Sequence, residues 1–348
     1  MDRRGFLISG GSAAVATGAA PATAAKPPVL ACPLRAPVPG ARVLTLAVAP
    51  GYELAGFGAD RLASRIVLAT AGRFRIERIG PAARADMRFA DAGWLSNLHP
   101  AFAFFAGLPL GEGLPSADLD GWLTLGGGQL LWDELARPFG LKPLVAGHTG
   151  DGGGLWSSVR LEAADDLIGL PIAARGLAAC VLEVMGAQVI DVAPPDLAAA
   201  LTTGRVGAGE AAAPLPGTAF NLEPLAQCCY RPGLYPHGAL TTLLVASGLW
   251  DGLDPADQAI FEACAAVEHR LAMAEAKMQA AVAAHVRPAA KWPRRTSWPP
   301  ALAEALARVA TAVVEEVAGF DAASGRIAAS YRAHRALQRV ADASPGVA

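Results

Sequence analysis

The sequence of 348 residues carries little charge for its length and almost no excess of either sign. Charged residues make up 17% of the chain, and the formal net charge is −2 with a pI near 6.3. The sequence therefore offers no overall basic field that would attract nucleic acid or anionic lipid. Hydrophobic residues make up 53%, which excludes a disordered, solvating chain.

Long apolar runs, disulfide patterns and enzyme motifs are also missing. After the N-terminus, no apolar run lasts the roughly 18–20 residues that a membrane span needs. The five cysteines show neither a Cys-x-x-Cys spacing nor a disulfide framework, so we expect most of them to be small buried hydrophobic groups. The sequence has no Gly-x-Ser-x-Gly elbow, no phosphate-binding loop and no His-Glu-x-x-His motif, which disfavours an enzyme. No fixed-period repeat indicates a solenoid or a propeller.

The first 25 residues are organised like an export signal. Arg3 and Arg4 precede an uncharged stretch, and small residues end the segment at Ala25. Paired arginines followed by Phe-Leu resemble a twin-arginine signal; an ordinary secretory signal or a membrane anchor is the alternative. The next residues, 26–41, are rich in Pro and Ala and are interpreted as a tether.

Apolar runs and helical stretches alternate from residue 42 to about residue 192. Val43–Val48 is a nearly continuous apolar run that predicts a strand buried on both faces, and Phe74–Ile79 predicts a second strand. This alternation favours an α/β fold with mixed sheets. The C-terminal third instead predicts long helices, the first with Asp254 as its N-cap and Pro255 at its first position. Helical apolar stripes follow at Ile260, Cys264, Val267, Leu271, Met278 and Val282, at Leu302, Leu306, Val309, Val313 and Val317, and in a short last helix at Ile327, Tyr331 and Leu337.

A set of short motifs gives the sequence its family likeness. The motifs are, in chain order, Ala85-Asp-Met87, Leu108-Pro-Leu-Gly111, Trp122-Leu-Thr-Leu-Gly-Gly-Gly-Gln-Leu-Leu-Trp132, Asp166-Leu-Ile-Gly-Leu170, Glu210, Tyr230-Arg-Pro-Gly233, Leu253–Ile260 and Ser330-Tyr-Arg332. The ordered set resembles the solute-binding proteins of TRAP (tripartite ATP-independent periplasmic) transporters, especially the branch that binds alpha-keto acids and related carboxylates. The likeness covers residues 43–340.

The resemblance implies an α/β, two-lobed periplasmic binding protein fold with hinge-crossing strands and long C-terminal helices. It assigns residues 42–145 and 238–256 to lobe I, residues 146–237 to lobe II, and residues 257–348 to a helical region that packs on both lobes. It further implies a periplasmic protein without catalysis that captures a small organic acid, a 2-oxo acid or similar carboxylate, for import by membrane permease subunits. Some relatives pair through their C-terminal helices, so a homodimer is a further expectation.

The arginine with which the family grips the ligand carboxylate is displaced in this chain. The aligned residue is Ala173, and Arg175 lies two residues further on. A shift of two residues keeps the same face of a strand, and the planar guanidinium matches a carboxylate with two hydrogen bonds. Arg175 is therefore the candidate carboxylate clamp, with a surface or hinge arginine as the alternative.

A glycine-rich stretch from His148 to Trp156 replaces a region that carries a ligand-binding glutamine in the keto-acid branch. The residue aligned with that glutamine is Gly152. Glycines let backbone N–H groups approach an anion closely, but they also suit a simple hinge. His148 and Asp151 are the ionisable groups of this stretch, and both are candidate ligand contacts.

Glu210 matches a family glutamate that helps to hold a cation beside the ligand. The resemblance thus implies Na⁺ or Ca²⁺ here, although hard cations need several oxygen ligands and one carboxylate does not make a metal site. The neighbouring family tryptophan is Ala211 in this chain, and the later acidic ligand aligns with Pro236. Tyr235 and His237 flank that position as substitute contacts or as ordinary turn residues.

The combined loss of these family side chains leaves a second hypothesis open. The chain would then be a diverged binding scaffold that acts as an extracytoplasmic sensor or partner-binding module. An α/β enzyme is the third and weakest hypothesis.

Overall fold

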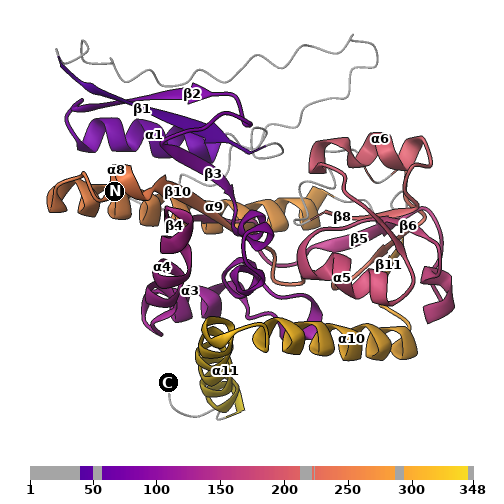
Figure 1. Ribbon diagram of the computed structural model, residues 1–348. Helices are drawn as coiled ribbons and strands as arrows, with labels where there is room; N and C mark the ends of the chain where they lie inside the picture. The colour runs from indigo at the N-terminus through magenta and orange to yellow at the C-terminus, as the bar shows by residue number, and fades with distance from the viewer. Residues whose placement is uncertain (1–39, 50–56, 212–221, 223, 287–293, 344–348) are drawn as a thin grey trace, which may run out of the picture. The chain divides into compact units, whose positions relative to one another are not determined.

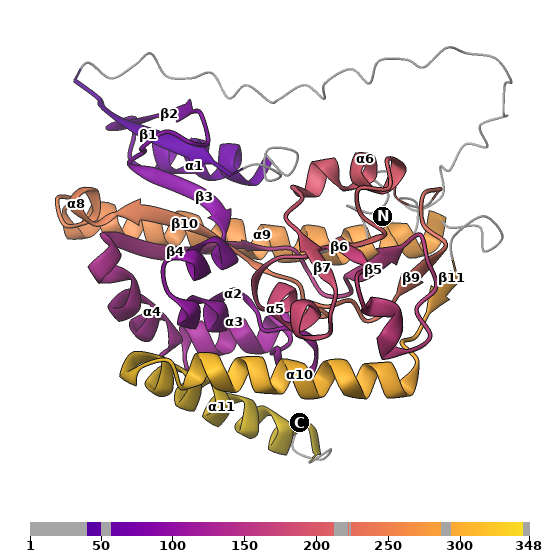
Figure 2. The ribbon, with the colours of Figure 1, turned by 45° about the vertical axis from the view of Figure 1, so that its right-hand side comes forward.

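The computed structural model describes residues 40–49, 57–211, 222, 224–286 and 294–343, which Figures 1 and 2 show as coloured ribbons. The predicted signal, and all of the predicted tether except Gly40 and Ala41, lie outside these residues. Within the described part of the chain, no helix combines the length and the apolar character that crossing a membrane requires.

The first sheet has five strands in the order β2-β1-β3-β10-β4. Its strands are β1 (Arg42–Val48), β2 (Phe74–Ile79), β3 (Met87–Asp91), β4 (Leu141–His148) and β10 (Leu240–Ala246). β1 runs parallel to β2 and β3, whereas β10 is antiparallel to both β3 and β4. The two strands predicted at residues 43–48 and 74–79 are thus confirmed, although Val43 itself is 45% exposed.

The second sheet has six strands in the order β11-β9-β5-β8-β6-β7. Its strands are β5 (Gly154–Ser157), β6 (Pro171–Ala173), β7 (Gln188–Ile190), β8 (Ala208–Ala211), β9 (Cys228–Tyr230) and β11 (Arg294–Thr296). Adjacent Cys228 and Cys229 of β9 belong to different apolar clusters, because successive strand residues point to opposite faces. Cys228, Cys229 and Cys264 are buried, whereas Cys180 is exposed.

The described α-helices flank the two sheets. The helices that precede β8 in the chain are α1 (Phe57–Ala69), α2 (Ala103–Ala106), α3 (Ser116–Thr124), α4 (Gly128–Ala136), α5 (Gly176–Val184) and α6 (Leu197–Thr202). They are followed by α8 (Ser247–Trp250), α9 (Pro255–Val286), α10 (Pro300–Ala318) and α11 (Ala322–Ala343). α9 packs on β4 and α1, and α10 packs on α5.

The C-terminal helices follow the predicted stripes only in part. α9 begins as predicted, with the Asp254 carboxylate accepting a hydrogen bond from the Asp257 N–H at 2.8 Å. The stripe of α10 is buried at its predicted positions Leu302, Leu306, Val313 and Val317. In α9 the predicted stripe residues Leu271, Met278 and Val282 are exposed, and so is Leu337 of α11, which is 22 residues long and not short.

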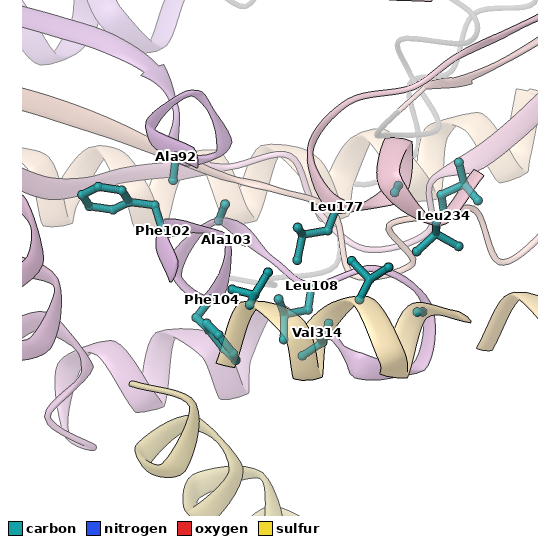
Figure 3. Packing of buried hydrophobic residues seen from close by; sticks show 14 of the residues in the cluster. Ala92, Phe102, Ala103, Phe104, Leu108, Leu177, Leu234 and Val314 are labelled. Carbon is teal, nitrogen blue, oxygen red and sulfur yellow. The ribbon is translucent and has the colours of Figure 1, made fainter. Parts of the chain in front are cut away.

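An apolar cluster joins the second sheet to the helices. Phe102, Phe104 and Leu108 meet Leu177 of α5, Leu234 and Val314 of α10 in this cluster (Figure 3). Leu234 lies in the segment that leads from β9 to β10, so the cluster fixes a connection between the two sheets.

Two connections between the sheets position the candidate site. We call residues 149–153, between β4 and β5, the first crossing segment, and residues 231–239, between β9 and β10, the second crossing segment. The Thr149 N–H donates to the Ala239 carbonyl oxygen at 2.9 Å, and the Gly152 N–H donates to the Pro236 carbonyl oxygen at 2.8 Å. The crossing segments are therefore held to each other along their length.

Candidate functional site

The second crossing segment is bonded to elements on both of its sides. The Gly233 N–H donates to the Gly153 carbonyl oxygen at 3.0 Å, and the Leu234 carbonyl oxygen accepts from the Leu110 N–H at 2.7 Å. The Leu234 side chain is fully buried in the cluster of Figure 3. These contacts therefore fix the backbone of the second crossing segment and, with it, the positions from which its polar side chains project.

Glu210, at the end of β8, points at the second crossing segment. Its Oε1 accepts a hydrogen bond from the Tyr235 N–H at 2.8 Å. Burial raises the pKa of Glu210 to about 7, against the opposing effect of the Tyr235 and Leu234 N–H groups. Gly233 has no room for a side chain, because a Cβ there would collide with Glu210 Oε1. A carboxylic acid that titrates near neutral pH is a typical feature of ligand and catalytic sites.

Tyr235 connects the same segment to the start of α5. Its hydroxyl donates to the Arg175 carbonyl oxygen at 3.0 Å and accepts from the Ala178 N–H at 3.1 Å. Burial raises the pKa of Tyr235, so the phenol stays protonated. The Arg175 guanidinium donates from Nε to Asp191 Oδ1 at 2.7 Å, and both of these side chains are exposed. The predicted clamp thus already has a carboxylate partner.

His148 and Asp151 occupy different environments although they are neighbours in sequence. His148 is 5% exposed, its Nδ1 accepts from the Gly150 N–H at 3.0 Å, and burial lowers its pKa to about 4. Asp151 accepts from Ser116 Oγ at 2.7 Å and pairs with His237 Nδ1 at 3.4 Å. Burial opposes the ionisation of Asp151, but the hydrogen bonds from His237 and Ser116 leave its pKa lowered. His148 is therefore neutral near pH 7, and Asp151 is an anion there.

The structure brings some of the predicted site residues together and separates others. Glu210, Tyr235 and Gly152 meet along the second crossing segment, and Asp151 meets His237 at the far end of that segment. Trp156 is 3% exposed and packs in an apolar cluster with Ala173, Leu197 and Cys229.

Arg231, which begins the second crossing segment, is not among the site residues predicted from the sequence. A Cβ added to Gly152 would lie 3.7 Å from Arg231 Nη1. The available signal was the cation inside the motif Tyr230-Arg-Pro-Gly233, at the end of a strand and next to a turn-forming Pro-Gly pair.

The side chains do not form a metal cage by themselves. In the described ranges, no group of three or more His, Cys, Asp or Glu side chains is placed to hold a metal ion. Glu210 offers one carboxylate, whose contacts are backbone N–H groups. A cation held there would take its other oxygen ligands from backbone carbonyl groups and from the ligand.

A cavity of about 280 Å³ lies elsewhere, between α4 and α11. Its lining includes apolar Leu131, Leu135 and Ile327 and polar His99 and Asp321. None of the site residues predicted from the sequence lines this cavity.

No protein-family model matches the chain. In sequence, the chain is similar to the monocarboxylate 2-oxoacid-binding periplasmic protein of Nostoc sp. strain PCC 7120. The two are 26% identical over 292 residues, which cover 80% of this chain and 79% of the relative.

Crystal structures of two bacterial proteins have a similar fold. One is a TRAP periplasmic solute-binding protein of Colwellia psychrerythraea with bound calcium and pyruvate, with a TM-score of 0.80, 19% identity, and coverage of 86% of this chain and 96% of that chain. The other is a TRAP periplasmic solute-binding protein of Pseudoalteromonas atlantica T6c with bound sodium and pyruvate, with a TM-score of 0.80, 18% identity, and coverage of 86% and 95%. The predicted two-lobed α/β fold is thereby confirmed, and the predicted resemblance to the solute-binding proteins of TRAP transporters is confirmed with it.

Proposed function

We propose that the chain is the periplasmic solute-binding component of a TRAP-type secondary transporter and captures a small organic acid, a 2-oxo acid or similar carboxylate, for import. The relative from Nostoc is named as a 2-oxoacid-binding protein, and both crystal structures of this fold contain pyruvate. Within the chain, the observation that carries the proposal is Glu210, a carboxyl group with a pKa of about 7 held against the second crossing segment. The protein binds and releases its ligand and performs no catalysis.

Glu210 gives the site two ways to accept an anion. When it is protonated, Glu210 donates a hydrogen bond to an oxygen of the acid. When it is ionised, a cation between the two carboxylates removes their repulsion, and hard cations take such oxygen ligands. The calcium and the sodium in the two crystal structures support a Na⁺ or Ca²⁺ ion beside the ligand in this role.

Arg175 is proposed to approach the ligand from the start of α5. Its ion pair with Asp191 is exposed on both sides, and exposed pairs contribute about 0–1 kcal/mol, so a ligand carboxylate competes with Asp191 at small cost. Tyr235 holds this region in place through its hydroxyl. The proposed lining of the ligand site also includes the other residues predicted from the sequence, which are His148, Asp151, Gly152, Trp156 and His237.

Export and partners complete the proposal. The twin-arginine-type segment in residues 1–25 would deliver the chain to the periplasm, the compartment of the relative from Nostoc. The exposed apolar side chains Leu271, Met278 and Val282 on α9 favour a protein partner on that helix, a permease subunit or a second copy of this chain.

A sensor or partner-binding module is the alternative function. It is favoured by the same exposed side chains of α9, together with the replacement of family ligand residues at Ala173, Gly152 and Pro236. Such a module would bind a receptor ectodomain in place of a permease.

A thermal-shift panel tests the proposed function. The purified chain is treated with a chelator and then heated with 2-oxo acids, hydroxy acids, dicarboxylates and amino acids, each with and without Na⁺ or Ca²⁺. A true ligand at 100 times its Kd adds about 2.7 kcal/mol to the free energy of unfolding, which raises the melting temperature by several degrees. If no compound of the panel raises the melting temperature, the proposal is contradicted. Capture of a receptor ectodomain without a permease supports the alternative.

A further inference from the structure

Arg231 is a cation without an acidic partner among the residues that the structure describes. Its Nε atom is buried and makes no hydrogen bond, while its backbone N–H donates to the Thr296 carbonyl oxygen at 2.9 Å. Other half-buried arginines are neutralised, for example Arg61 by Glu268 and Arg335 by Glu112. Because a buried polar group is costly without a partner, the Arg231 guanidinium is a group that a bound anion would satisfy.

Two glycines make the space that the Arg231 side chain fills. A Cβ on Gly154 would lie 3.5 Å from Arg231 Cγ, and a Cβ on Gly152 would lie 3.7 Å from Arg231 Nη1. Gly152 has a φ of +93°, a backbone conformation that suits glycine. The guanidinium therefore lies beside the glycine-rich first crossing segment, which carries the candidate ligand contact Gly152.

The strand register keeps Arg231 away from the carboxylate of Glu210. Leu155 pairs with Glu210 on one side and with Tyr230 on the other. Directly paired residues share a face of the sheet, and successive residues alternate. Glu210 is therefore on the face of Leu155 and Tyr230, whereas Arg231 follows Tyr230 and continues the opposite face. The nearby acid thus does not neutralise this cation.

The face to which Arg231 belongs carries buried Trp156 on β5 and small residues on β8 and β6. Trp156 pairs with Gly209, and Gly209 pairs with Ala173 on the next strand. Ala173 is the position at which the resemblance leads one to expect an arginine, so the sheet has lost a cation on β6 and has one at the end of β9. Arg175, the other cation near this edge, is already paired with Asp191.

We infer that Arg231 supplies the guanidinium that receives the carboxylate of the organic acid. This inference rests on the proposed function and adds to it the residue that recognises the ligand charge. The planar fork of an arginine binds a carboxylate through two parallel N–H···O bonds. An acid seated there provides the partner that Arg231 Nε lacks among the described residues.

Calorimetric titration with pyruvate tests this role. The proteins are the wild-type chain, Arg231→Gln, Arg231→Lys and, as the matched control, Arg78→Gln, which removes only an exposed ion pair with Asp60 outside the crossing segments. Loss of a charge-assisted contact weakens binding by about 10–100-fold, which is expected for Arg231→Gln. Arg231→Lys, which keeps the charge but lacks the fork, is expected between Arg231→Gln and wild type, and Arg78→Gln within about threefold of wild type. Methyl pyruvate, the uncharged ester, is expected to bind Arg231→Gln as well as it binds the wild-type chain.

A second measurement is independent of ligand affinity. Since Arg231 is an uncompensated, partly buried charge, Arg231→Gln without ligand is expected to melt at the same or a higher temperature than wild type, whereas a structural arginine would leave a destabilised protein. If Arg231→Gln does not fold, the comparison is made between Arg231→Lys and Arg78→Gln.

The outcomes separate the inference from the proposed function. If the wild-type chain binds pyruvate and both Arg231 variants bind it equally well, the inference is wrong and the proposed function stands. If the wild-type chain binds none of the organic acids of the panel, both fail. Weakened binding of pyruvate with unchanged binding of its ester supports the inference.

Discussion

At the scale of single residues, Glu210 shows how a fold sets the chemistry of a common side chain. It is the second-last residue of β8, and its carboxyl group accepts a hydrogen bond from the backbone N–H of Tyr235. Two N–H donors favour the ionised form, yet burial outweighs them and moves the pKa from 4.5 to about 7. The protein therefore holds, at neutral pH, a group that exchanges its proton easily when an anion or a cation arrives.

Replacement of Glu210 by Gln is expected to remove a pH-dependent loss of the free energy of unfolding. Because the folded pKa is raised above 4.5, the folded state binds more protons than the unfolded state between about pH 4.5 and pH 7. The contribution of Glu210 to the free energy of unfolding thus falls as the pH rises through this window. At 1.36 kcal/mol per pKa unit, Glu210→Gln gains at most about 3 kcal/mol over wild type at pH 8 and nearly nothing at pH 4.5.

Urea unfolding at pH 4.5, 6 and 8 measures this difference. Exposed Glu162, whose side chain is 68% exposed, provides Glu162→Gln as a control without the trend. A difference between Glu210→Gln and wild type that does not grow with pH would show that Glu210 titrates normally.

Tyr235 is expected to contribute to stability through its hydroxyl. Tyr235→Phe leaves the Ala178 N–H and the Arg175 carbonyl oxygen without their partner, so the free energy of unfolding should fall by about 1–2 kcal/mol. The matched control Arg175→Gln removes only an exposed ion pair and should change stability by less than about 0.5 kcal/mol. Equal effects of the two variants in urea unfolding would contradict this reading of the contact.

Residue identity alone predicted part of this site. Glu210 and Tyr235 were candidates from the motifs, and the structure joins them by a hydrogen bond. The unpaired state of Arg231 was not predictable, because it depends on the register of β5 with β8 and β9. The depressed pKa of His148 likewise follows from burial at the end of β4, which its sequence neighbours do not determine.

At the scale of elements, local signals were sufficient where a helix begins. The Asp254 carboxylate caps the start of α9, as the Asp-Pro pair indicated. Asp254→Ala is expected to lower the free energy of unfolding by about 1 kcal/mol. Asp251→Ala, an exposed neighbour outside the helix, is the control and should be near neutral in the same urea titration. No loss in Asp254→Ala would mean that water replaces the cap.

Local signals failed where the partner of an element decides its environment. The apolar stripe of α9 predicted a buried face at Leu271 and Met278, but the helix presents alanines to the glycines beside it. Ala272 approaches Gly147, and Ala276 approaches Gly150, so the larger apolar side chains point elsewhere.

At the scale of the whole described chain, the fold consists of two sheets whose connections are bonded to each other. The Thr149 N–H bonds to Ala239, the Ala239 N–H bonds back to Thr149 Oγ1 at 2.8 Å, and the Gly152 N–H bonds to Pro236. Gly150 and Gly238 both have positive φ, and a Cβ on Gly238 would collide with the Gly150 carbonyl oxygen. The two crossing segments are thus packed at their backbones, with the candidate ligand residues attached to them.

Ligand binding is therefore expected to protect the crossing segments more than the rest of the chain. An acid that contacts residues of both segments stabilises the state in which their hydrogen bonds are formed, and at 100 times its Kd it slows amide exchange through local opening by up to about 100-fold. Hydrogen exchange followed by mass spectrometry, with and without pyruvate, should show slowing in peptides covering residues 147–153 and 231–239. Peptides of α10, at residues 300–318, serve as the internal control, and Arg231→Gln under the same pyruvate concentration should lose most of the protection. Equal slowing in α10 and in the crossing segments would indicate global stabilisation without coupling at the crossings, and no slowing anywhere would contradict a ligand site between these segments.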